Sequence, residues 1–192
     1  KIIEQTNKFI SNEIDFEELN NLTEEERQAA LKILKEYTQQ GKSDTYTNMI
    51  LADYKEIPAD IITFIKDKNY MGNAWHNPDG KCKLSSFWEE KLKQIFPDPF
   101  TTNYNNLIES GARGLGKSEV AVVIIQYLMH RVMCLKNPHA FFDLKPTEKI
   151  CFAFMNITLG LAEDVANSKF QNSIKLSPWF LSRGTLTGRG KD

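Results

Sequence analysis

Eight residues just past the middle of the chain, Gly111–Ser118, constrain the fold more than any other segment. They read Gly-Ala-Arg-Gly-Leu-Gly-Lys-Ser, which matches the phosphate-binding pattern of Gly, any four residues, Gly-Lys and Ser or Thr. Glycines let the backbone curl with its N–H groups pointing inward, and no Cβ blocks a phosphate. The pattern places Lys117 against the β- and γ-phosphates of a nucleotide and the Ser118 hydroxyl on Mg²⁺. The sequence therefore predicts a phosphate-binding loop and a helix whose positive end faces the same anion.

The segments on either side of this loop occur in the order that such a loop requires. Residues 105–110 contain the apolar pair Leu107-Ile108 and predict a short buried strand, and residues 118–132 predict a buried helix of about four turns. A second apolar run at 149–156 predicts another strand, which completes a βαβ unit. The predicted fold class is α/β: a P-loop NTPase with a parallel sheet core, incomplete in this chain, behind an N-terminal helical region. The alternative is a glycine-rich turn that binds nothing, and the agreement of motif and context argues against it.

The net charge of −1 conceals an uneven distribution along the 192 residues. Residues 1–60 carry seven Lys and Arg against thirteen Asp and Glu, so we do not expect this part to contact DNA. Residues 165–192 are basic, which fits either phosphate contacts or a solvated loop. No apolar stretch approaches the roughly 20 residues of a membrane span, so no membrane partner is expected.

Two regions are predicted, a helical N-terminal region at 1–70 and the N-terminal part of a P-loop ATPase domain at 71–192. In the first region, Thr23 and Glu26 have the spacing of a capping box, and apolar residues then recur at helical spacing up to Gly41. In the second region, Ser86 is the predicted cap of a helix over 87–96. The aromatic residues around this helix either stack on an adenine or belong to the core: Trp88, Phe96, Phe100 and Tyr104.

One residue of the loop narrows the interpretation further. Arg113 stands four residues before Lys117, and the loop is preceded by a Phe87-Trp88 helix and followed by a long apolar helix. This arrangement, over roughly residues 70–180, resembles the ATPase domain of the large terminase subunit of tailed bacteriophages, which packages DNA into capsids. Arg113 would then sense or stabilise the γ-phosphate, since a guanidinium fork suits phosphate oxygens. The alternative for Arg113 is that it points away and pairs with a nearby carboxylate.

The resemblance implies a set of site residues, a pair of cofactors and several partners. Lys117 and Arg113 would be catalytic, Ser118 would ligate Mg²⁺, and the ATP contacts would be Gly111, Ala112, Arg113, Gly114, Leu115, Gly116, Lys117, Ser118 and Glu119. The implied partners are double-stranded DNA, a portal protein, a small terminase subunit and further copies of the same chain in a ring. The implied location is the cytoplasm of the infected bacterial host.

The chain also departs from the terminase pattern. No apolar run ending in Asp-Glu follows residue 118, and no carboxylate cluster of a two-metal nuclease is visible, although the parent protein would be an endonuclease as well. We therefore expect the N-terminal portion of a longer protein, which binds nucleotide and hydrolyses it poorly by itself. The open alternatives are another P-loop enzyme, such as a helicase or AAA+ ATPase, and a non-catalytic docking fragment whose acidic helical region binds a portal or small subunit.

Overall fold

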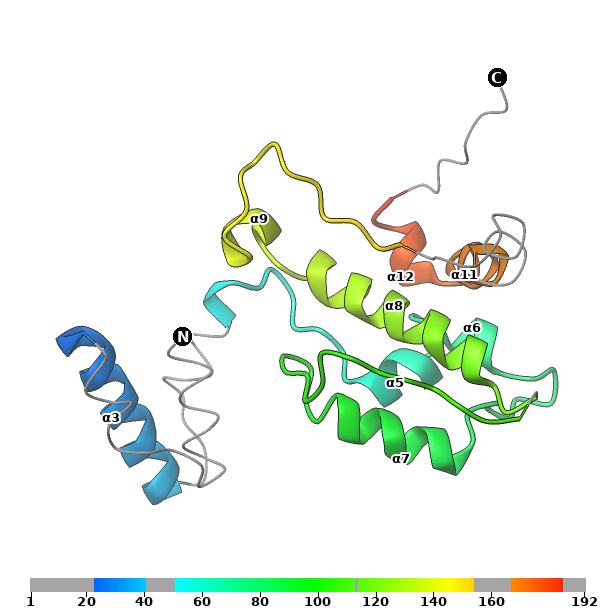
Figure 1. Cartoon of the computed structure of the whole chain (residues 1–192), viewed down its shortest axis with the longest axis horizontal. Helices are drawn as coiled ribbons and strands as arrows, with labels where there is room; N and C mark the ends of the chain where they lie inside the picture. The colour runs from blue at the N-terminus through cyan, green and yellow to red at the C-terminus, as the bar shows by residue number, and fades with distance from the viewer. Residues whose placement is uncertain (1–22, 41–50, 113, 154–166, 185–192) are drawn as a thin grey trace. The chain divides into compact units, whose positions relative to one another are not determined.

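The computed structural model describes residues 23–40, 51–112, 114–153 and 167–184 (Figure 1). Backbone contacts divide the chain into two units, Lys1–Glu56 with Leu135–Phe141, and Ile57–Cys134 with Phe142–Asp192. The described helices of the first unit are α3 (Glu24–Gln40) and α9 (Pro138–Phe141). Those of the second unit are α5 (Ile61–Lys66), α6 (Gly72–Trp75), α7 (Ser86–Ile95), α8 (Lys117–Met133), α11 (Ser168–Ile174) and α12 (Pro178–Leu181).

The capping box predicted for the first unit is confirmed. The Thr23 backbone N–H donates to Glu26 Oε2 at 2.9 Å, and the Glu26 N–H donates to Thr23 Oγ1 at 3.3 Å. Helix α3 is described as far as Gln40, and Gly41, the predicted stop, lies outside the described residues. Reciprocal capping satisfies two N–H groups that a helix start otherwise leaves without partners.

The second unit is built around α8, which lies between α5 and α7 on one side and α11 and α12 on the other (Figure 1). Val120, Val123 and Tyr127 of α8 are at most 1% exposed. Because these apolar side chains recur at helical spacing, α8 is fixed by burial along much of its length. No helix among the described residues is long and apolar enough to cross a membrane, α8 included.

His130, on the same helix, is a structural residue. Its Nε2 accepts the backbone N–H of Ala59 at 3.0 Å, and its ring centroid lies 4.3 Å from that of Trp179 and 5.0 Å from that of Phe64. Burial, with a smaller effect from the positive charge of Arg183 and Arg131, lowers the pKa of His130 to about 3. The imidazole is therefore neutral and joins α8 to the segment before α5.

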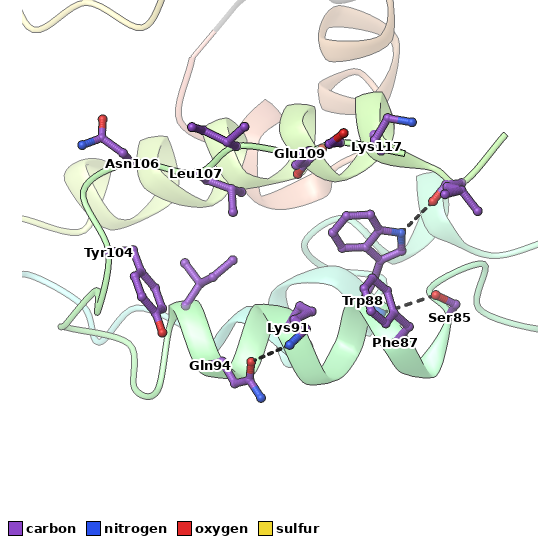
Figure 2. A pocket seen from close by; sticks show the side chains of 14 residues that line it. Ser85, Phe87, Trp88, Lys91, Gln94, Tyr104, Asn106, Leu107, Glu109 and Lys117 are labelled. Atoms are coloured by element: carbon purple, nitrogen blue, oxygen red, sulfur yellow. Dashed lines mark hydrogen bonds between the residues drawn. The ribbon is translucent and has the colours of Figure 1, made fainter. Parts of the chain in front are cut away.

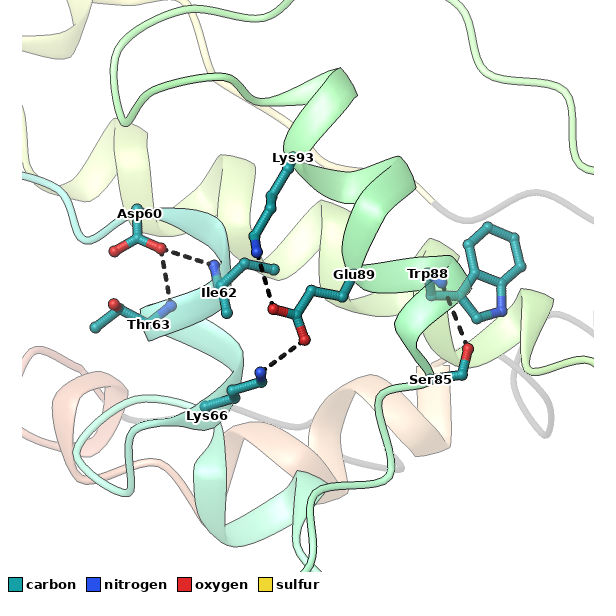
Figure 3. A network of polar contacts seen from close by, with 8 residues as sticks. All are labelled: Asp60, Ile62, Thr63, Lys66, Ser85, Trp88, Glu89 and Lys93. Carbon is teal, nitrogen blue, oxygen red and sulfur yellow. Dashed lines mark hydrogen bonds and ion pairs between the residues drawn. The ribbon is translucent and has the colours of Figure 1, made fainter.

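Capping side chains also fix where α5 and α7 begin (Figure 3). Asp60 Oδ1 accepts the N–H groups of Ile62 and Thr63, both at 3.0 Å, and Ser85 Oγ accepts the N–H of Trp88 at 3.4 Å. The N-cap of α7 is thus Ser85, and the predicted cap, Ser86, is the first helical residue. This error of one position arose because two serines are adjacent, and only the backbone conformation distinguishes them.

Between the two helices, Glu89 of α7 accepts from Lys66 of α5 at 2.7 Å and from Lys93 at 2.9 Å (Figure 3). These two hydrogen bonds lower the pKa of the Glu89 carboxyl. The pair Lys66–Glu89 links α5 to α7 at the surface.

The predicted strands at 105–110 and 149–156 are not observed. Residues 105–110 and 149–153 form no strand, and 154–156 lie outside the described residues. Isolated bridges, Tyr54 with Leu135 and His76 with Cys82, are the β pairings of the described chain. A parallel strand needs a neighbouring strand for its N–H and C=O groups, and the described residues offer none beside 105–110. Ile108, expected to be buried, is accordingly 92% exposed.

The close approach of α6 to the end of α5 makes Gly72 sensitive to substitution. A Cβ at Gly72 would lie 2.6 Å from the Lys66 carbonyl oxygen and 2.7 Å from the Asp67 carbonyl carbon. We expect Gly72→Ala to lower the free energy of unfolding by about 2 kcal/mol in urea titrations, because backbone must move. The matched control is Gly184→Ala, whose Cβ meets nothing within 4 Å and which should change stability by less than about 0.5 kcal/mol. Equal losses in the two variants would contradict this packing.

His130 predicts a pH dependence of stability. Its pKa is about 3 in the folded protein and about 6.5 when unfolded, so only the unfolded chain binds this proton between those values. The free energy of unfolding should therefore fall as pH falls from 6.5 towards 3. The contribution of His130 to this slope should reach about 1.4 kcal/mol per pH unit. His130→Gln keeps an acceptor for the Ala59 N–H and removes the titration. Denaturant titrations across this range should give a shallower pH slope for the variant, and identical slopes would refute the assignment.

Candidate functional site

The loop at Gly111–Ser118 has the backbone conformation that its glycines predict. Gly114 and Gly116 have φ angles of 83° and 78°, and Gly116 is the N-cap of α8. Residues with a Cβ are strained at these angles, so the turn into the helix depends on glycine. The first N–H groups of α8 have no acceptor within the helix, which makes this end suited to an anion.

Lys117 folds back across the loop. Its Nζ donates to the carbonyl oxygens of Gly111 at 2.9 Å and Ala112 at 2.6 Å. An ammonium has three N–H donors, so one remains for a further oxygen. The positive charge therefore sits over the loop, close to the start of α8. Arg113, the other predicted catalytic residue, lies outside the described residues.

A cavity of about 520 Å³ opens over the end of the loop. Its lining consists of Gly114, Leu115, Gly116, Lys117, Ser118, Glu119 and Lys169. The exposed Ser118 stands in the first turn of α8, where Mg²⁺ would take its hydroxyl together with nucleotide phosphates and water. The described residues contain no group of three or more His, Cys, Asp or Glu placed to hold a metal by themselves. Ser118 thus fits a metal that arrives with a phosphate ligand.

A second cavity, of about 550 Å³, borders the same loop (Figure 2). Trp88 and Lys91 of α7 form one wall, and the segment leading into the loop forms the other. The Trp88 indole N–H donates to the Leu115 carbonyl oxygen at 2.7 Å, so this aromatic wall is tied to the loop itself. The lining comprises Ser85, Phe87, Trp88, Lys91, Gln94, Ile95, Tyr104, Asn106, Leu107, Ile108, Glu109, Ser110, Leu115 and Lys117.

Glu109 stands near Lys117 at the loop end of this second cavity (Figure 2). Burial raises the pKa of its carboxyl, and the positive charge of Lys117 opposes that rise. Glu109 Oε1 is buried and accepts no hydrogen bond from the described residues. A buried oxygen without a donor is costly, so this position favours a ligand that supplies an N–H or O–H.

Of the four predicted aromatic candidates, two line the second cavity, and only Trp88 contacts the loop itself. Trp88 and Tyr104 line the second cavity. Phe96 belongs to the core instead, 4% exposed and with its ring centroid 5.0 Å from that of Tyr127. Phe100 is held by its carbonyl oxygen, which accepts from Arg131.

Two residues near the loop were missed by sequence reasoning. Glu109 lies in the segment that the sequence predicts to be a buried strand, and Lys169 lies in the stretch 165–192, which the sequence marks only as basic. Lys169 lies fifty positions beyond Glu119, with which it forms an ion pair at 2.6 Å. No periodicity or motif joins these two positions, so only the packing of α11 on α8 shows their proximity.

A comparison with known protein families places the loop within a matching domain family. The model described as "Uncharacterized protein MJ0330, N-terminal P-loop domain" matches residues 16–187. No curated protein and no solved structure matches the chain. The match supports a P-loop NTPase domain, and hence nucleotide binding, typically with Mg²⁺. The chain belongs to the family of the N-terminal P-loop domain of the uncharacterized protein MJ0330.

Proposed function

We propose that the chain binds ATP with Mg²⁺, and that its parent protein uses ATP hydrolysis to move duplex DNA into a viral capsid, as large terminase subunits do. The observation that carries the nucleotide part is the position of Lys117, whose ammonium lies over Gly111 and Ala112 beside the start of α8. A charged amine and unpaired helix N–H groups that converge on one cavity favour a polyphosphate.

The two cavities suggest how the whole nucleotide is held. Both are lined by Leu115 and Lys117, so both border the loop. The phosphates would occupy the cavity over Ser118, and the base and sugar would occupy the aromatic cavity beside Trp88. Trp88 and Tyr104 offer flat apolar faces for a base, and Glu109 offers an acceptor for a sugar hydroxyl.

The motor part of the proposal rests on the loop sequence and its flanks. Arg113 within the loop, the Phe87-Trp88 helix before it and the long helix α8 after it are the features that resemble large terminase subunits. Phosphoryl transfer is catalysed largely by positioned charge, which Lys117 and Arg113 would supply. The implied partners are duplex DNA, a portal protein, a small subunit and other copies of the chain, in the cytoplasm of an infected bacterium.

Removing the loop lysine tests nucleotide binding. We expect Lys117→Ala to weaken binding of Mg²⁺-ATP by at least about tenfold in calorimetric titration, because a charge-assisted contact to phosphate is lost. Lys81→Ala is the matched control, since Lys81 is exposed and lies in neither cavity. Equal ATP affinities for the two variants, or an intact protein that does not bind ATP, would remove the proposal.

The motor assignment is tested by the nucleic acid that stimulates hydrolysis. ATP turnover by the full-length protein should rise with duplex DNA and fall back as salt increases, because duplex DNA is gripped through its phosphates. The measurement is phosphate release with duplex and with single-stranded DNA of equal length. Stimulation by the single strand alone would favour a helicase and contradict the packaging assignment.

A further inference from the structure

Lys169 brings a positive charge to the cavity over Ser118 from a different part of the chain. This cavity, lined by residues 114–119 and Lys169, is called the phosphate cavity below. Every other residue that lines this cavity belongs to the continuous stretch 114–119. Lys169 belongs to α11 and lines the cavity together with the loop residues, from which it is separated by fifty or more positions in the sequence. A cation from outside the loop could respond to a phosphate that the loop itself does not enclose.

Helix α11 is held firmly enough on α8 to define where Lys169 stands. Gln126 of α8 is fully buried, and its Nε2 donates to the Phe170 carbonyl oxygen at 3.2 Å and to Ser173 Oγ at 2.5 Å. The Ser173 hydroxyl in turn donates to the carbonyl oxygen of Lys169 at 2.7 Å. These bonds fix the backbone of Lys169 and leave its long side chain able to move.

The present partner of Lys169 can be displaced. Its Nζ lies 2.6 Å from Glu119 Oε1, and the two side chains are 39% and 53% exposed. Ion pairs with this much solvent contact are weak. A phosphate carries more charge than a carboxylate and offers several acceptor oxygens, so it would compete well for the same ammonium.

We propose that Lys169 is a sensor of the terminal phosphate, which exchanges Glu119 for an oxygen of the γ-phosphate when a nucleoside triphosphate binds. This rests on the proposed function, since it requires a nucleotide on the loop. Loop N–H groups cradle the α- and β-phosphates, so the third phosphate extends from the loop into the remaining cavity, where Lys169 is. A diphosphate leaves the Lys169–Glu119 pair intact. The side chain of Lys169 thereby distinguishes a triphosphate from a diphosphate.

The test compares a non-hydrolysable ATP analogue with ADP, both with Mg²⁺, by calorimetry. We expect Lys169→Ala to lower the affinity for the analogue by about tenfold and the affinity for ADP by less than about twofold, because only the triphosphate reaches Lys169. Lys169→Arg should restore the preference for the triphosphate. The matched control is Lys175→Ala, which removes the same charge from the exposed C-terminal end of α11 and should alter neither affinity.

A second variant tests the exchange itself. Glu119→Gln removes the competing carboxylate and should tighten binding of the analogue severalfold, whereas the same change combined with Lys169→Ala should not. Suppose that wild-type protein binds both nucleotides and that this binding depends on Lys117. If the affinities of Lys169→Ala then equal those of Lys175→Ala, the sensor is refuted and nucleotide binding stands. If wild-type protein binds neither nucleotide, both the sensor and the proposed function fall.

Discussion

The burial of α8 is the constraint on which the rest of the second unit depends. Its Val120, Val123 and Tyr127 side chains are enclosed, so the helix has one position in the fold. The loop is attached to the first residue of that helix through Gly116, whose left-handed backbone turns the chain back sharply. The end of α8 that faces the cavity is therefore held in place before any ligand arrives, and binding need not order it.

The same helix determines what surrounds the loop. On one side α7 presents Trp88, whose indole N–H holds the Leu115 carbonyl, and on the other side Gln126 fixes α11. A shift of α8 would alter both contacts at once. The aromatic cavity and the phosphate cavity are thus parts of one arrangement, although their residues come from segments far apart in sequence.

How far the sequence predicted this structure depends on the range of the interactions. Thr23 and Glu26 are three residues apart, and their capping box could be predicted because both partners are local. The glycine turn before Lys117 was predictable for the same reason. The pair Lys169–Glu119 joins distant segments, and no local pattern encodes it. The sheet was predicted from apolar runs such as Leu107-Ile108, but a strand forms only beside a partner, and the described residues hold none there.

Under the proposed function, the charges around the loop favour the binding of a nucleotide more directly than its hydrolysis. Lys117 lies over the loop and Lys169 faces it from α11, so the cavity can hold a highly charged anion. Hydrolysis also requires a group that orients the attacking water. Of the nearby carboxylates, Glu119 is paired with Lys169, and Glu109 lies at the other cavity, where burial raises the pKa of its carboxyl. If Lys169 moves from Glu119 to a bound phosphate, the Glu119 carboxylate loses its ion-pair partner. A carboxylate next to Ser118 in the sequence would then be released only when a triphosphate is bound.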